Sequence, residues 1–157
     1  TKIDNSVINA SGRDGFVRKE GVFFTTIATF NRENWQLPTP VEHPSSNSLF
    51  AFDLDGNFKY QYKAKGTMEA QAFSENGLIA CAIGRNVRTH DYSCHGALII
   101  NLNDGVQHKM FSTEGPVQAI DISPNGSQIA AVEAPALTPD GKIIGAHRLH
   151  IWRLKEK

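Results

Sequence analysis

The stretch AQAFSENGLIACAIG, residues 70–84, has a near copy in AIDISPNGSQIAAVEA, residues 119–134. In each stretch an alternating apolar–polar pattern ends at a serine, either Ser74 or Ser123, and is followed by an Asn-Gly turn and then an apolar run. Asn-Gly accepts the positive φ of tight turns and is a strong hairpin signal. The two stretches therefore predict two β-hairpins of the same design, about 49 residues apart.

The repeat extends beyond these hairpins. LFAFDLDGNFKYQY, residues 49–62, matches ALIINLNDGVQHKM, residues 97–110, as an apolar strand, an Asp/Asn-Gly turn and an alternating strand. A fainter third copy uses residues 6–15 and 21–30, and HRLHIWRL, residues 147–154, supplies one more strand. No segment has the periodicity of an amphipathic helix. We therefore predict an all-β chain of four-stranded antiparallel units, each of about 48 residues.

This strand count and period are typical of a β-propeller blade, in which strands a to d run outward from the axis. We expect residues 1–157 to form one partial propeller of roughly three blades. The first blade covers about residues 6–64, the second about 68–114, and the third about 117–154, without its outer strand. An ordinary β-sandwich of about 11 strands, or a barrel, is the alternative fold.

One part of the chain has a familiar pattern. The motif ISPNGSQIAAVEA…LHIWRL, within residues 122–154, is similar to WD40 repeats, where a Ser-Pro-x-Gly turn leads to a small-residue strand and then to an Ile-Trp strand. Over about residues 6–154 the chain resembles the WD40-like β-propeller superfamily. It departs from the family signature because Arg153 follows Trp152 and no Gly-His pair precedes the a strands. The resemblance implies the broad propeller class. Trp152 is expected to pack between blades rather than to contact a ligand.

Three blades do not close a ring, because propellers typically need 4–8. If each open face exposes on the order of 500 Å² of apolar surface, leaving that surface in water loses roughly 12 kcal/mol of hydrophobic stabilisation. This loss is comparable to the stability of a whole domain. We expect the ring to be completed by further blades, on another chain or on a missing segment, or by a second copy in a six-bladed homodimer. In that homodimer, residues 1–4 would serve as the missing outer strand beside residues 149–154 of the partner.

The loop lengths indicate where function lies. The a–b and c–d turns are short, whereas the b–c connections are long in all three units, at residues 31–47, 85–96 and 134–146. Strands alternate in direction, so these three connections emerge on one face, which we call the loop face. Long loops are commonly functional. Within the third connection, LTPDGK, residues 137–142, predicts the tip of a projecting hairpin.

The loop face is rich in residue types that anchor protein interfaces, such as Trp, Tyr and Arg. The candidate partner-binding residues are Trp35, His43, Arg85, Arg88, His90, Asp91, Tyr92 and His95. HDYSCH, residues 90–95, contains metal-ligand types, but its spacing matches no zinc pattern. We expect an ordinary polar loop there, with no metal and no cofactor.

No nucleophile elbow, P-loop, HExxH or dinucleotide motif is present in the sequence. We therefore predict a non-catalytic protein–protein interaction or assembly module that binds through the loop face. One alternative is part of a propeller enzyme that holds a metal or cofactor on the histidine-bearing loop face. Another is a structural fragment whose functional residues lie on missing blades.

The charge composition limits which classes of partner are expected. Lys plus Arg and Asp plus Glu each number 16, so the net charge is zero, and neither nucleic acid nor an anionic membrane is expected as a partner. The absence of an apolar run of roughly 18 residues and of a signal-peptide core favours a cytoplasmic protein. Cys81 lies in an apolar run and is expected to be buried, whereas Cys94 lies in a polar loop.

Overall fold

The computed structural model describes residues 2–3, 6–30, 42–87 and 91–154. All regular structure in these ranges is β-strand, and no helix there has the length and apolar character to cross a membrane. The strands are β1 (Lys2–Ile3), β2 (Ser6–Arg18), β3 (Gly21–Phe30), β4 (Ser48–Phe52), β5 (Phe58–Lys63), β6 (Met68–Phe73), β7 (Leu78–Ile83), β8 (Gly96–Asn101), β9 (Gln107–Ser112), β10 (Val117–Ile122), β11 (Gln128–Glu133), β12 (Ala136–Leu137), β13 (Ile143–Ile144) and β14 (Arg148–Arg153).

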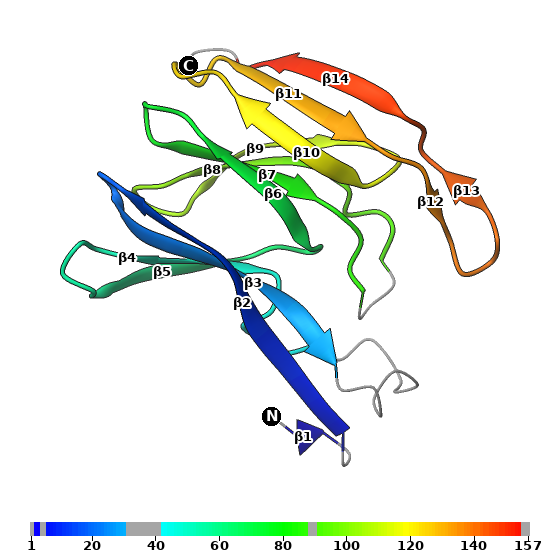
Figure 1. The fold of residues 1–157 in the computed structure, drawn as a ribbon, viewed down its shortest axis with the longest axis horizontal. Coiled ribbons are helices and arrows are strands. Elements are labelled where there is room, and N and C mark those ends of the chain that lie inside the picture. Colours follow the sequence, from blue (N-terminus) through cyan, green and yellow to red (C-terminus); the bar gives the residue numbers. More distant parts are fainter. Residues whose placement is uncertain (1, 4–5, 31–41, 88–90, 155–157) are drawn as a thin grey trace.

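Three antiparallel sheets follow one another along the chain and in space (Figure 1). The first sheet has the order β1-β2-β3-β4-β5, the second β6-β7-β8-β9, and the third β10-β11-β14. A separate hairpin, β12–β13, is inserted in the connection from β11 to β14 and projects beyond the end of the third sheet. Apart from the inserted β12–β13 hairpin, strands that follow one another in the chain are neighbours in each sheet, which is the pattern of propeller blades. The predicted fold class, an all-β chain of about three antiparallel blades in an open ring, is confirmed.

The N-terminal residues 2–3 lie at the edge of the first sheet. Lys2 and Ile3 pair with Val7 and Ser6 of β2, so β1 forms a fifth strand at the edge of the chain's own first sheet. Only two residues connect β1 to β2. A link this short costs little entropy to close, which favours a local hairpin.

The a–b turns of the second and third sheets explain the repeated sequence. The hydroxyl of Ser74 accepts a hydrogen bond from the Leu78 amide at 3.0 Å, and that of Ser123 accepts one from the Gln128 amide at 2.9 Å. Each turn then passes through a glycine of positive φ, at 86° and 73°. The Ser-x-Asn-Gly pattern is thus a turn that closes on its own side-chain hydrogen bonds.

The second sheet is covered on both faces. Along β7, Ile79, Cys81 and Ile83 pack toward the first sheet, while the alternate residues face the third. All six β7 residues are buried. Trp152 of β14 stacks on Phe111 of β9 with ring centroids 4.9 Å apart, so it packs between sheets as predicted.

Both cysteines are free and buried. Burial raises the pKa of the Cys81 thiol to about 12, as suits an apolar core position. Cys94 lies in a loop, as the sequence predicts, and its side chain is buried there with Sγ 3.5 Å from the Gly84 carbonyl oxygen. Desolvation raises its pKa as well.

Candidate functional site

The long connections all leave the sheets at one end (Figure 1). Strands β3, β7 and β11 end on this side and β4, β8 and β14 begin there, and the short links from β5 to β6 and from β9 to β10 lie there too. Strand alternation requires this arrangement. The opposite end carries the a–b and c–d turns, where the Leu102 amide donates to the Gly77 carbonyl oxygen at 2.9 Å.

The candidate partner-binding residues have different environments. Trp35, Arg88 and His90 lie outside the described residues. Arg85 is exposed, while His43, Asp91 and Tyr92 are half-buried. His95 is fully buried, so it is not available on the surface as the sequence suggested. Its Nδ1 lies 2.9 Å from the Glu114 carbonyl oxygen. Its ring packs edge-on against the Tyr92 ring, with the two ring centroids 6.0 Å apart.

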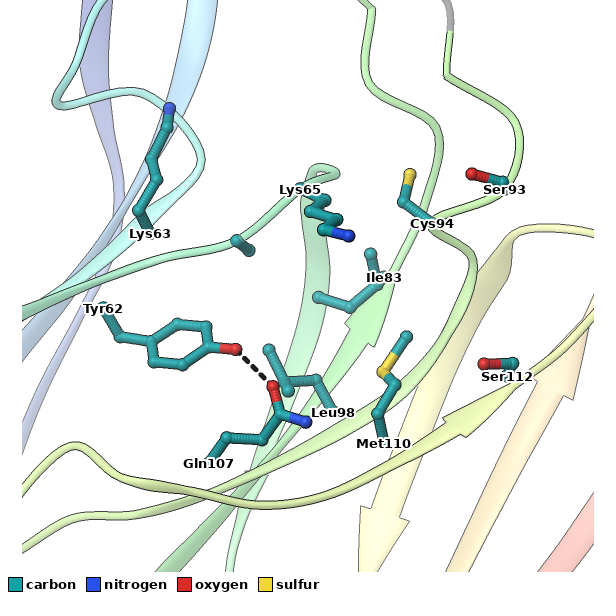
Figure 2. A pocket seen from close by; sticks show the side chains of 11 residues that line it. Tyr62, Lys63, Lys65, Ile83, Ser93, Cys94, Leu98, Gln107, Met110 and Ser112 are labelled. Carbon is teal, nitrogen blue, oxygen red and sulfur yellow. Dashed lines mark hydrogen bonds between the residues drawn. The ribbon is translucent and has the colours of Figure 1, made fainter.

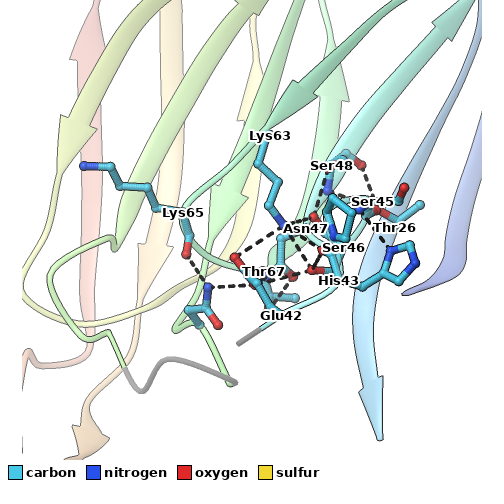
Figure 3. A network of polar contacts seen from close by, with 12 residues as sticks. Thr26, Glu42, His43, Ser45, Ser46, Asn47, Ser48, Lys63, Lys65 and Thr67 are labelled. Carbon is cyan, nitrogen blue, oxygen red and sulfur yellow. Dashed lines mark hydrogen bonds and ion pairs between the residues drawn. The ribbon is translucent and has the colours of Figure 1, made fainter. Parts of the chain in front are cut away.

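Glu42 is the centre of a polar network at the base of the loop face (Figure 3). Its Oε2 accepts hydrogen bonds from Ser46 at 3.3 Å, Asn47 at 3.2 Å and Asn86 at 3.2 Å. Its Oε1 lies 3.4 Å from the Lys63 ammonium. One carboxylate thereby joins the first b–c connection, the end of β5 and the second b–c connection. Sequence spacing held no signal for this role, since Asn86 is 44 residues away.

Small polar residues complete this network. Ser46, Asn47 and Ser48 are buried, and Asn47 has a positive φ of 49°. The Thr26 hydroxyl accepts from the Ser48 amide at 3.1 Å and donates to the Ser45 carbonyl. Buried polar groups that are hydrogen-bonded in this way hold a loop in a single conformation. The network therefore supports the loop face.

An inter-sheet cleft of about 300 Å³ opens next to the network, between the outer rims of the first and second sheets (Figure 2). Its residues are Tyr62, Lys63, Ala64, Lys65, Ile83, Ser93, Cys94, Leu98, Gln107, Met110 and Ser112. On one side the Tyr62 hydroxyl donates to Gln107 Oε1 at 2.7 Å and links β5 to β9.

A second hollow, the hairpin groove, lies between the second b–c connection and the β12–β13 hairpin and measures about 580 Å³. Its residues are Tyr92, Ser93, Glu114, Thr138, Asp140, Lys142, Ile143, Ile144 and Gly145. The hairpin turn is closed by the Thr138 amide, which donates to the Lys142 carbonyl at 2.8 Å, so the predicted hairpin tip is confirmed. Leu137 and Ile143 of this hairpin are 63% and 68% exposed.

Glu133 anchors the base of the hairpin. Its buried carboxylate accepts the Gly115 amide at 2.8 Å and lies 2.6 Å from His150 Nε2 and 3.6 Å from Arg148. Burial pushes the pKa of Glu133 upward, but the hydrogen bonds from His150 and Gly115 and the charge of Arg148 outweigh it, so the pKa lies below its ordinary value. The carboxylate is therefore ionised at neutral pH.

Metal-ligand residue types are dispersed across the described part of the chain. Within it, no group of three or more His, Cys, Asp or Glu side chains is placed to hold a metal ion. The HDYSCH stretch is described only from Asp91 onward.

No protein-family model and no curated protein matches the sequence. Among solved structures, the chain is similar to the β-propeller domain of Cps50 (Swd1) from Myceliophteria thermophila, with a TM-score of 0.43 and 12% sequence identity. The similarity covers 94% of this chain and 41% of that chain, so the present chain spans less than half of that chain's length.

Proposed function

We propose that this chain is a three-blade propeller segment that acts as a non-catalytic protein-interaction module and binds its partner through the loop face. The hairpin groove is the observation that carries the proposal. There, exposed Leu137 and Ile143 stand on the hairpin that borders the groove, and Tyr92 lines its other side. Exposed apolar side chains beside a tyrosine are typical of interface anchors. The Glu42 and Glu133 networks hold the surrounding loops in place.

The charged groups of the groove favour binding over catalysis. Glu114 pairs with Arg148 at 2.9 Å. A hydrogen bond from Thr138 lowers the pKa of Asp140, whereas a general acid or base works best with a pKa near the working pH. These carboxylates shape and charge the groove, and the proposal gives them no proton to transfer.

The free face of the third sheet supports a second part of the proposal, that further blades complete the ring. By strand register, Val132, Leu149 and Ile151 stand where Ala82, Ala97 and Ile99 stand in the second sheet. The second-sheet residues are all 0% exposed, and they face the third sheet. Their third-sheet counterparts are 43%, 68% and 68% exposed. These three positions are therefore exposed because no sheet of the described chain packs against them.

The face of the first sheet that no other described sheet covers, its free face, is aromatic. Phe24 stacks on Phe50 and Phe52 with ring centroids 4.9 and 5.8 Å apart, and Phe58, at the end of this row, is 60% exposed. An apolar surface of this kind on a soluble protein commonly marks an interface. We propose that blades of another chain, or of a second copy of this one, cover both free faces.

Partner capture from cell extract with paired variants tests the loop-face proposal. Tyr92→Ala combined with Leu137→Asp and Ile143→Asp should reduce the recovery of bound proteins at least tenfold, measured by quantitative mass spectrometry. Leu54→Asp with Val106→Asp is the matched control, because these side chains are 64% and 59% exposed on the opposite turns. Recovery that survives the loop-face triple variant, with both variants shown to be folded by circular dichroism, would contradict the proposal.

A further inference from the structure

The inter-sheet cleft is a second recess, separate from the hairpin groove. One wall is formed by the end of β5 and the link to β6, and the other by β8 and β9 (Figure 2). Its depth is apolar, because Ile83 and Leu98 are 2% and 3% exposed and Met110 lies beside them. Methionine adapts its shape readily and suits a surface that accepts different side chains.

The rim of the cleft is cationic. Two lysines line it, and none of the described lining residues is acidic. The Lys63 ammonium is engaged, at 3.4 Å from Glu42 and 3.0 Å from the Ser46 hydroxyl. The Lys65 ammonium makes no hydrogen bond or close ion pair with the described part of the chain, although its charge acts on Asp91 and Cys94. It extends away from Lys63 toward Ile83 and Cys94 (Figure 2). One available cation therefore stands over an apolar floor.

The size of the cleft and its neighbours favour an extended peptide. A volume of about 300 Å³ is at the small end of ligand sites, enough for one or two side chains. Within the described chain β9 pairs only with β8, so its outer edge has unpaired backbone groups beside the cleft. Extended peptides bind to such edges through their backbone and place alternate side chains in neighbouring recesses.

We infer that the inter-sheet cleft binds an acidic–apolar segment of a partner protein. An aliphatic side chain of the segment enters between Leu98 and Met110, and a neighbouring carboxylate pairs with Lys65. This inference rests on the proposed function as a protein-interaction module, to which it adds a second contact of defined chemistry. The pairing is charge-assisted, and the apolar floor excludes water on one side of it.

Peptide selection tests the inference without a known partner. A phage-displayed library of random seven-residue peptides is selected on the wild-type chain, and synthetic copies of the enriched peptides are titrated by fluorescence anisotropy. The expected peptides carry Asp or Glu next to Leu, Ile, Val or Met, and Lys65→Glu weakens their binding at least tenfold. Lys59→Glu, on the same outer strand as Tyr62 but outside the cleft, leaves binding unchanged.

Three outcomes would overturn the inference: no enrichment, enriched peptides without an acidic residue, or equal binding to wild type and Lys65→Glu. The last outcome includes peptides that bind to the free sheet faces, which Lys65 does not touch. The loop-face triple variant keeps its cleft, so it should still bind the selected peptides. Loss of peptide binding to Lys65→Glu together with unchanged partner capture by the triple variant would uphold the cleft and reject the loop-face proposal, and the reverse pattern would do the opposite.

Discussion

Glu133 shows how a single side chain can hold several parts of this molecule. Its two oxygens contact the link between β9 and β10, through Gly115, and strand β14, through His150. The His150 ring lies parallel to Trp152, with centroids 4.9 Å apart, and Trp152 in turn stacks on Phe111. A buried carboxylate stabilises a fold only when it is well paired, and a partner removed from such a pair is costly.

The acid sensitivity of the fold should depend on Glu133. Its pKa in the folded chain lies below the ordinary value of a glutamate, so the ionised group stabilises the fold above the unfolded pKa, and this contribution is lost as the pH falls through the folded pKa. Glu133→Gln should cost about 2 kcal/mol at pH 7 and should flatten the decline of the melting temperature between pH 5 and 3. Parallel melting profiles for wild type and Glu133→Gln would contradict this role, and exposed Glu75→Gln is the control.

Residues differ in how well the sequence predicts their contacts in the fold. Ser74 and Ser123 bond to amides four and five residues away, so local spacing predicts their turns. Glu42 and Glu133 act on partners that only the fold brings near, 44 and 17 residues away. The sequence places His95 in a loop but does not predict its burial, because the Glu114 carbonyl that its ring contacts is 19 residues away.

At the scale of strands, Gly96 controls how β8 begins beside β9. Its φ is +152°, and a β-carbon at this position would lie 2.2 Å from the Phe111 carbonyl oxygen. Gly21 at the start of β3 meets the Phe52 carbonyl in the same way, with a φ of +146°. The close approach lets the strands pair from their first residue, and no residue that carries a β-carbon fits at these positions.

Gly96→Ala should therefore destabilise the fold by about 3 kcal/mol, since it adds a backbone clash to an unfavourable φ. Gly56→Ala is the informative comparison: its φ is +88°, but its β-carbon would meet nothing within 4 Å. It should cost only about 1 kcal/mol. Urea unfolding followed by circular dichroism measures both, and equal losses would show that the contact with Phe111 has no effect.

Strands whose residues alternate between apolar and polar, or form a continuous apolar run, are readily predicted from sequence. Strands without either pattern are not. The alternation in β6 and β10 and the apolar runs in β7 and β8 identify strands directly. β1 has two residues, too few for any period, and its position in the first sheet follows from a short connection that sequence patterns do not report. The turn of the β12–β13 hairpin was visible because Pro-Asp-Gly is a strong local signal.

At the scale of the whole molecule, the main feature is the pair of sheet faces that no described sheet covers. One presents Leu149 and Ile151, and the other presents a row of phenylalanines. Two copies would supply six blades, which lies within the range of closed propellers. A heterologous contact of third sheet on first sheet, made twice, closes such a ring with twofold symmetry.

Light scattering coupled to size exclusion tests self-closure. A homodimer should have twice the 17.3 kDa of one chain, and Leu149→Asp with Ile151→Asp should convert it to monomer, because charges replace the apolar contact. Leu54→Asp, on a remote turn, should leave the dimer intact. A wild-type monomer would show that a second copy does not cover these faces, and a stable complex with another chain would identify that chain as the source of the missing blades.

The position of the second sheet between two others has a consequence for how the molecule opens. In a row of stacked units, each unit is stabilised by its neighbours, and an end unit has one neighbour where a middle unit has two. Backbone amides of β7 should therefore exchange with solvent deuterium only through global unfolding, while those of β14 exchange through local opening of the third sheet. Binding of a further blade to that sheet would slow the exchange of β14 toward the rate of β7, so exchange along the chain reports which of its ends is covered.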